Sequence, residues 1–181
     1  MRRTLVLLAL VVLAGCGTTA SGPIAAARPA EAQHLRLDWR ETYPASGRQL
    51  VFAVDEVNVT TEGWSARVAV ANETRVPFLA GGEPAALAYG VMLFATGDLD
   101  ELEQAAAGGT LPAVRKAETI EPALPAVLEP GATWRGTLAA SGSLADGSWL
   151  RIAFGPLRVQ GDPPQGMQPV VLWITDRAHR L

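Results

Sequence analysis

The sequence predicts an all-β protein, an antiparallel β-sandwich with one short helix inserted between strands. Short runs of alternating apolar and polar residues recur between turn signals, which is typical of half-buried strands. Only one segment has the caps and the spacing of a helix. The chain has no internal repeat and no alternation of strands with helices that would indicate a parallel sheet. A partly open barrel is the alternative architecture.

The first strands are predicted from residue 35 onward. Apolar and charged residues alternate over 35–40, a period of two that predicts one buried face. The segment 50–60 is rich in β-branched residues, which favour strands. A turn at 61–63 separates it from a strand over 64–70, so we expect these two strands to form a hairpin.

The middle of the chain predicts a buried strand followed by the helix. Residues 87–95 form a continuous apolar run, which indicates a central strand buried on both faces or, alternatively, a short buried helix. In the next segment, 98–107, we expect Asp98 to be the N-cap, and Glu101 completes the pattern of a capping box. Two glycines then end the helix. Its predicted apolar face consists of Leu99, Leu102 and Ala106.

Three more strands are predicted after the helix, at 134–140, 149–159 and 169–175. Residues 129–131 have the sequence of a type II turn, with proline and glycine at its central positions. Gly155-Pro156 interrupts the second of these strands, which predicts a bulge or an edge position. The last strand is centred on Val170, Leu172 and Ile174.

The N-terminus has the pattern of a secretory leader. Arg2 and Arg3 precede an apolar stretch over 5–13, and small residues precede the single cysteine, Cys16. The apolar stretch is about half the roughly 20 residues that a membrane-spanning helix needs. An ordinary signal peptide with a chance cysteine and a twin-arginine export signal are the alternatives.

The run Leu13-Ala14-Gly15-Cys16 resembles the lipobox of bacterial lipoproteins at all four positions. The resemblance implies cleavage between Gly15 and Cys16 and a diacylglycerol on the sulfur of Cys16. Two acyl chains give firm attachment to a membrane, so we expect the protein on the extracytoplasmic face of a bacterial cell membrane. The predicted organisation is a signal peptide at 1–15, a lipidated cysteine and flexible tether at 16–33, and a β-sandwich domain at 34–181.

Three further segments resemble the small immunoglobulin-like domains of bacterial lipoproteins, many of which have no known function. They are 64–74, ending in Val70-Ala71-Asn72-Glu73-Thr74; Leu128-Glu129-Pro130-Gly131 followed by Trp134-Arg135-Gly136-Thr137; and 150–159. The resemblance implies an immunoglobulin-like sandwich that acts as an extracytoplasmic interaction or accessory module. It implies no catalytic residues.

Composition excludes several kinds of partner and chemistry. The formal net charge is −3, and removal of Arg2 and Arg3 with the leader makes the chain more acidic, which argues against nucleic acid as a partner. Lipidation of Cys16 leaves no thiol for a disulfide, a thiolate metal site or a cysteine nucleophile. The covalent lipid is the only bound group that we expect.

Candidate metal ligands have simpler explanations. Helix capping and the preference for acidic residues at a helix N-terminus account for one acidic group, which lacks the spacing of a calcium loop. Two histidines, His34 and His179, lie far apart in the sequence and do not complete a zinc ligand set. We therefore predict no metal site. The acidic group consists of Asp98, Asp100, Glu101 and Glu103.

Serine nucleophiles with a histidine base are the remaining catalytic possibility. None of the candidate serines lies in a GxSxG elbow, so we predict no catalytic residues and no enzyme activity. The serines considered are Ser65, Ser141, Ser143 and Ser148.

Five tryptophans are many for a chain of this length: Trp39, Trp64, Trp134, Trp149 and Trp173. We expect most of them to fill the core. Trp64 and Trp149 follow turns directly and are the predicted candidates for surface contact. The function predicted is an interaction with an unknown envelope protein. The alternatives are a carrier of a small apolar ligand, in a cleft near 89–94 and 99–107, and, as a weaker possibility, an envelope enzyme.

Overall fold

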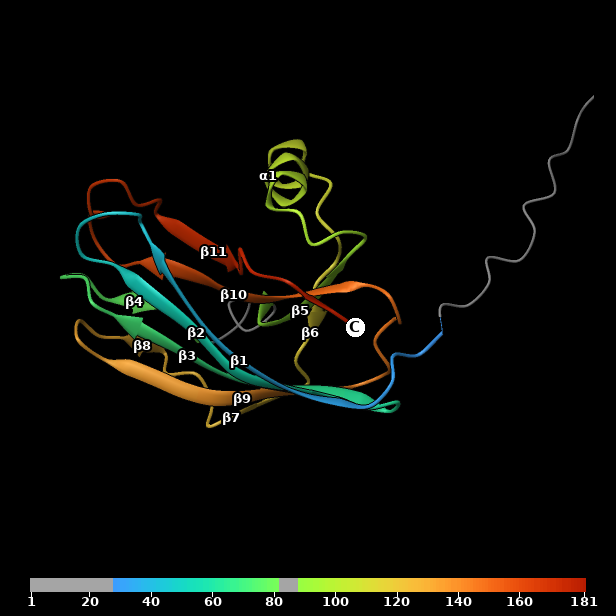
Figure 1. The fold of residues 1–181 in the computed structure, drawn as a ribbon. Helices are drawn as coiled ribbons and strands as arrows, with labels where there is room; N and C mark the ends of the chain where they lie inside the picture. The colour runs from blue at the N-terminus through green and yellow to red at the C-terminus, as the bar shows by residue number, and fades with distance from the viewer. Residues whose placement is uncertain (1–27, 82–87) are drawn as a thin grey trace, which may run out of the picture.

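The computed structural model describes residues 28–81 and 88–181, which form two antiparallel sheets packed face to face (Figure 1). One sheet contains, in spatial order, β1 (Gln33–Tyr43), β2 (Leu50–Val59), β3 (Gly63–Asn72), β9 (Thr133–Ser141) and β7 (Thr119–Glu121). The other contains β6 (Arg115–Lys116), β5 (Gly90–Phe94), β10 (Trp149–Val159), β4 (Phe78–Leu79) and β8 (Val127–Leu128), and β11 (Val170–Ile174) and β12 (His179–Arg180) pair with β10. The predicted all-β sandwich is confirmed.

The long strands lie where hydrophobic periodicity predicts them. β2 and β3 form the expected hairpin, with Val59 opposite Trp64. At its turn the hydroxyl of Thr60 accepts hydrogen bonds from the backbone N–H groups of Glu62, at 3.2 Å, and Gly63, at 3.0 Å. β5 pairs with β10 on one side and with β6 on the other, and it is a strand rather than the alternative buried helix.

The structure refines two details of the later strands. β10 shifts register between Phe154 and Leu157, so the bulge at Gly155 is confirmed. β10 pairs with β11 on one side, and on the other side with β5 up to Ala153 and with β4 from Arg158, so Gly155-Pro156 lies where its neighbour on that side changes. In β11, Val171 faces the core whereas Leu172, expected at the strand centre, is 47% exposed. A strand of five residues with apolar side chains on both faces gives no periodicity that identifies its buried face.

Five short strands, β4, β6, β7, β8 and β12, were not predicted from the sequence. Each has only two or three residues. A segment that short cannot show a period of two, and its pairing depends on the longer strands beside it.

The domain begins earlier than the predicted boundary at residue 34. Pro29 forms a β-bridge with Ala145. Ala30 is fully buried, and its N–H donates to the carbonyl of Leu144 at 2.8 Å. The end of the predicted tether is therefore part of the folded domain, and residues 16–27 lie outside the described residues. Composition alone suggested a tether because small residues such as alanine give no strand signal.

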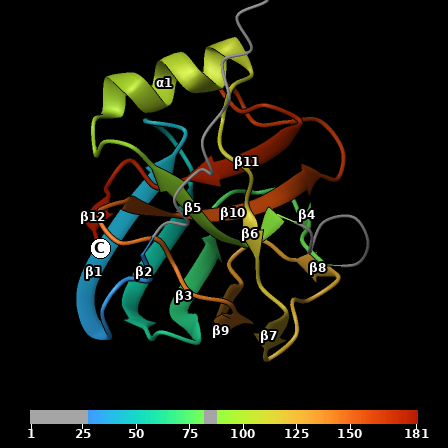
Figure 2. The same ribbon diagram turned by 90° about the vertical axis from the view of Figure 1, so that its right-hand side faces the viewer.

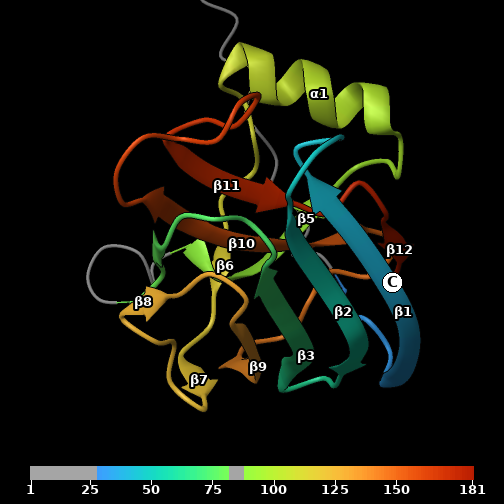
Figure 3. The ribbon, with the colours of Figure 1, turned by 90° about the vertical axis from the view of Figure 1, so that its left-hand side faces the viewer.

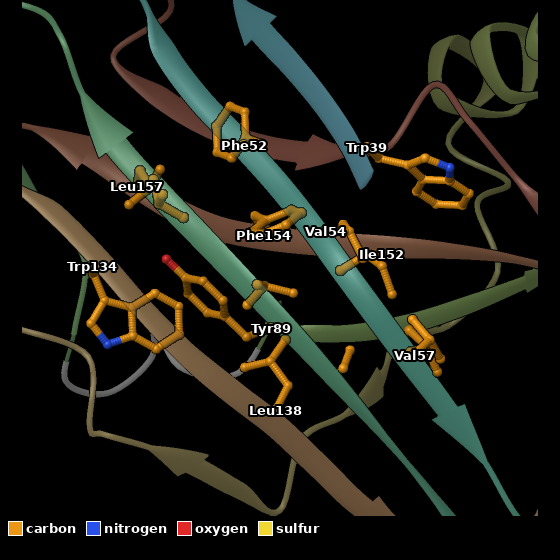
Figure 4. Packing of buried hydrophobic residues seen from close by; sticks show 14 of the residues in the cluster. Trp39, Phe52, Val54, Val57, Tyr89, Trp134, Leu138, Ile152, Phe154 and Leu157 are labelled. Carbon is orange, nitrogen blue, oxygen red and sulfur yellow. The ribbon is translucent and has the colours of Figure 1, made fainter. Parts of the chain in front are cut away.

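A continuous row of six aromatic rings crosses the interior between the sheets, and Figure 4 shows four of them, those of Phe52, Phe154, Tyr89 and Trp134. Neighbouring ring centroids lie 5.2–6.5 Å apart, which is the favourable range for aromatic pairs. Phe52 and Trp173 are stacked, with an interplanar angle of 3°. Because residues of both sheets contribute to the row, it joins the sheets. In order, its members are Tyr43, Trp173, Phe52, Phe154, Tyr89 and Trp134.

Almost every polar atom in this row has a partner. The indole N–H of Trp173 donates to Glu41 at 2.9 Å, and that of Trp134 to the carbonyl of Pro122 at 3.2 Å. The hydroxyl of Tyr43 accepts from the N–H of Gln168 at 3.2 Å. The hydroxyl of Tyr89 is the exception: it is buried without a hydrogen-bond partner among the described residues, and burial raises its pKa.

The helix α1 (Leu99–Gly108) covers the outer face of the seven-stranded sheet (Figure 2). Asp98 caps it as predicted, accepting from the N–H of Asp100 at 3.0 Å. The capping box does not close, because the carboxylate of Glu101 instead accepts a hydrogen bond from the hydroxyl of Thr96. Leu102 is the buried residue of α1, and it packs on the small second core. Leu99 and Ala106, predicted on the same apolar face, are exposed.

Arg151, in β10, connects the start of α1 to the segment that follows β11. It is fully buried. One guanidinium nitrogen donates to the carbonyls of Thr175, at 2.7 Å, and Asp176, at 2.5 Å. The other donates to the carbonyls of Gly97 and Asp98, both at 3.0 Å. The four hydrogen bonds join the start of α1 to the segment that follows β11.

The described part of the chain includes no helix with the length and apolarity needed to cross a bilayer.

Two tyrosines of the aromatic row predict opposite effects of the same substitution. Tyr89→Phe removes a buried hydroxyl that has no partner among the described residues, so we expect it to raise the free energy of unfolding by about 1 kcal/mol. Tyr43→Phe removes a hydroxyl that holds a backbone N–H, so we expect it to lower the free energy of unfolding by about 1 kcal/mol. Equilibrium unfolding in urea measures both values. Equal losses of stability in the two variants would contradict this account of the row.

Candidate functional site

Three loops lie at one end of the sandwich (Figure 3). They line a cleft of about 780 Å³, which we call the loop-end cleft. They are the β1–β2 loop, the β3–β4 loop and the β10–β11 loop. The lining consists of Pro44 and residues 46–48, 74–76 and 164–166. A smaller hollow, of about 410 Å³, lies beside α1.

The β3–β4 loop is held by the buried side chain of Asn72. Its carbonyl oxygen accepts from the backbone N–H of Thr74, at 3.0 Å, and from the Thr74 hydroxyl, at 2.6 Å. Its amide nitrogen donates to the carbonyls of Val76, at 2.8 Å, and Leu128, at 2.9 Å. Buried polar groups that are fully hydrogen-bonded rigidify their surroundings. The backbone on both sides of Arg75 is therefore fixed.

Backbone and side-chain contacts join the three loops to one another. The N–H of Glu73 donates to the carbonyl of Gln49 at 2.9 Å, and the Gln49 side chain donates to the carbonyl of Pro44 at 2.8 Å. The N–H of Gln168 donates to the hydroxyl of Tyr43 at 3.2 Å. The walls of the cleft are thus connected to each other and, through Tyr43, to the aromatic row.

The charged residues that line the cleft are Arg48 and Arg75. Both side chains are exposed, and neither forms an ion pair with a carboxylate within the described ranges. Glu73, the neighbour of Thr74, lines a different hollow, on the outer face of the five-stranded sheet, together with Arg40 and Arg135. The cleft is therefore cationic.

The two tryptophans predicted as surface contacts behave differently. Trp64 is 4% exposed and packs in the main core, so its prediction as a surface residue is wrong. It follows a turn, but the alternation of β3 directs its side chain inward. Trp149 is half-buried against the second core, and its ring covers Gly97, where an added Cβ would lie 2.5 Å from Trp149 Cε3.

The histidines and serines considered for catalysis do not meet. His34, on β1, contacts Asn58, on β2, through its Nδ1. His179 lies in β12, which belongs to the other sheet. The hydroxyl of Ser141 donates to the carboxylate of Glu118 at 2.9 Å. In the described ranges no serine is hydrogen-bonded to a histidine. Ser148 donates to a backbone carbonyl, that of Ala145, and the carbonyl of Ser143 accepts from the guanidinium of Arg115.

The hydrogen bonds to Ser141 lower the pKa of Glu118. The Glu118 carboxylate thus accepts from both the backbone N–H and the hydroxyl of Ser141. The Glu118–Ser141 pair therefore connects the start of β7 to β9. This structural role accounts for the pair without a catalytic acid and nucleophile.

Of the acidic residues at the start of α1, Asp98 caps the helix, and Glu101 accepts a hydrogen bond from the hydroxyl of Thr96. Among the residues that the structure describes, no group of three or more His, Cys, Asp or Glu side chains is placed to hold a metal ion. Gly15 and Cys16, the predicted cleavage and lipidation positions, lie outside the described residues.

At the place beside the helix where an apolar cleft was predicted, the structure has a hollow with polar residues in its lining. A hollow of about 410 Å³ lies between Phe94 and α1, and Glu101, Gln104 and Thr110 give it a polar lining. The space under the helix is filled by the second core, which contains Met92, Phe94 and Leu102.

Sequence reasoning did not identify Arg48 and Arg75 as a pair. They are 27 positions apart, on loops between predicted strands. Their proximity depends on which strand ends meet, and this follows from the pairing of β1, β2 and β3. The available signal was weak: each arginine lies within three residues of a proline or a glycine in a loop.

No family model, no curated protein and no solved structure matches the chain.

The buried amide of Asn72 predicts a large loss of stability on truncation. Asn72→Ala leaves the Thr74 N–H and two carbonyls without their partner, so we expect the free energy of unfolding to fall by about 3 kcal/mol. We also expect faster hydrogen exchange in the β3–β4 loop. Asn58→Ala is the matched control, since Asn58 is half-buried on an outer face, and should cost less than about 1 kcal/mol. Similar losses in both variants would contradict this role of Asn72.

Proposed function

We propose that the protein is a lipid-anchored interaction module of the bacterial cell envelope, which uses the loop-end cleft to contact a partner protein. The observation that supports this proposal most strongly is the opposite placement of the cleft and of the first described residues. The resemblance of residues 13–16 to a lipobox supplies the anchor in this proposal. Kinship with immunoglobulin-like domains stays a prediction.

The chain enters the domain at the end away from the cleft, which we call the entry end. Pro29 bridges Ala145 in the β9–β10 connection, and that connection bonds to the β2–β3 turn through Gly142 and Glu62. β2 runs from the cleft to this turn, and its 10 residues span roughly 33 Å. Figure 1 shows the first described residues and the three loops at opposite ends. An anchor at Cys16 would therefore leave the cleft facing away from the membrane.

An interaction function is favoured over an apolar carrier by where the open space lies. The aromatic row and its neighbours fill the interior between the sheets, whereas the loop-end cleft is a surface feature with a cationic lining. Binding surfaces are commonly formed by loops that a rigid scaffold holds in place.

Lipid anchoring is tested by the substitution Cys16→Ser. We expect the wild-type chain to fractionate with membranes and to incorporate labelled fatty acid, because two acyl chains attach a protein firmly. The variant should lose the label and either leave the membrane fraction or remain unprocessed. Ser21→Ala, in the same region, is the control and should behave as the wild type does. A Cys16→Ser protein found in membranes at its normal mature size would disprove anchoring through this cysteine.

The contact surface is tested by photo-crosslinking in intact cells. A photoreactive residue at Ser46, in the cleft, should give discrete protein adducts, because this end meets the partner. The same residue at Thr61, an exposed position in the turn at the entry end, is the control and should not give them. The proposal fails if Ser46 gives no adduct, or if Thr61 gives the same adducts at a similar yield.

A further inference from the structure

The loop-end cleft differs in charge from the chain as a whole. The chain has a formal net charge of −3, but the charged side chains that line the cleft are those of Arg48 and Arg75. Clefts lined by charge of one sign raise the local concentration of ligands of the opposite sign. The cleft is thus placed to attract an anionic group, although the formal net charge of the chain is negative.

Both arginines project from backbone that is already ordered. Arg75 lies between Thr74 and Val76, which are both hydrogen-bonded to Asn72. Arg48 precedes Gln49, which bonds to Pro44 and to Glu73. Binding here would need to order the two side chains but not the loops, and such pre-organisation improves affinity.

The remaining lining is suited to a peptide rather than to a small inorganic anion. Pro44, Val76 and Pro164 supply apolar surface, and Ser46 and Gln165 supply hydrogen-bonding groups. A volume of about 780 Å³ is typical of pockets that enclose ligands much larger than an ion. Guanidinium groups bind carboxylates through paired hydrogen bonds. An extended segment with carboxylates and apolar side chains matches all of these features.

We propose that the loop-end cleft binds an acidic peptide segment of the partner protein, whose carboxylates pair with Arg48 and Arg75. The apolar side chains of the segment contact Pro44, Val76 and Pro164. This inference rests on the proposed interaction function for the source of the peptide. A membrane headgroup is the less favoured anion, because the cleft lies at the end opposite to Pro29, where the chain enters the domain.

Peptide binding can be measured by fluorescence anisotropy with the full chain in a neutral detergent. The probe is a labelled short peptide of alternating Glu and Pro, and the reference peptide has Gln in place of each Glu. We expect the Glu peptide to bind about tenfold more tightly at low salt, because two charge-assisted pairs form only with carboxylates. Salt should reduce this difference.

The two cleft arginines have a matched control on the outer face of the five-stranded sheet. The double variant Arg48→Gln/Arg75→Gln should lose the preference for the Glu peptide. Arg40→Gln/Arg135→Gln changes the net charge equally but lies in a different hollow, and it should keep the preference. Equal binding of the two peptides by the wild-type protein, or equal losses in the two double variants, would overturn the proposal.

Two further measurements separate this proposal from its alternatives. Inorganic phosphate and vesicles of phosphatidylglycerol are tested as competitors of the Glu peptide. If the protein binds either of them through Arg48 and Arg75 but does not bind the Glu peptide, the cleft recognises phosphate groups and the peptide proposal is wrong. The assay does not depend on lipidation. Failure of peptide binding therefore leaves the anchoring result unchanged, and failure of anchoring leaves a positive peptide result unchanged.

Discussion

The contact between the two sheets through six aromatic rings is the interaction on which the rest of the structure depends. The rings come from β1, β2, β9, β10, β11 and the segment before β5, so every long part of the sandwich except β3 contributes to the row. With no free cysteine in the described ranges to form a disulfide, burial of apolar surface supplies most of the stability. Large aromatic side chains bury the most area per residue.

The same row determines where the open surface lies. Tyr43 ends the row at the mouth of the sandwich, and its hydroxyl holds the β10–β11 loop through Gln168. Asn72 holds the β3–β4 loop nearby. Because these contacts fix the loops in place, the cleft is a rigid opening. A packed interior thus produces a pre-organised surface at one end.

Much of the fold could be predicted from the sequence, because the longer strands show either apolar–polar alternation, as in β1, or runs of apolar and β-branched residues, as in β2 and β5. The helix was also predictable, since Asp98 and Gly109 give local capping signals that need no tertiary partner. The cleft could not be predicted in this way. Arg48 and Arg75 line one cleft only because β2 and β3 pair in one register, and their loops have no periodicity. The prediction for Trp64 was wrong for a different reason. Its position after a turn suggested exposure, whereas the alternation of the strand determines that it is buried.

Arg151 and the cleft arginines show how burial changes what one residue type does. Arg151 is fully buried, and its two terminal guanidinium nitrogens donate to four backbone carbonyls, so these two nitrogens are occupied within the fold. Arg48 and Arg75 are exposed beside a cleft, and within the described ranges neither forms an ion pair. Their donors therefore stay available to a ligand. Since guanidinium groups stay charged at any physiological pH, a cleft with two of them keeps its preference for carboxylates wherever the protein resides.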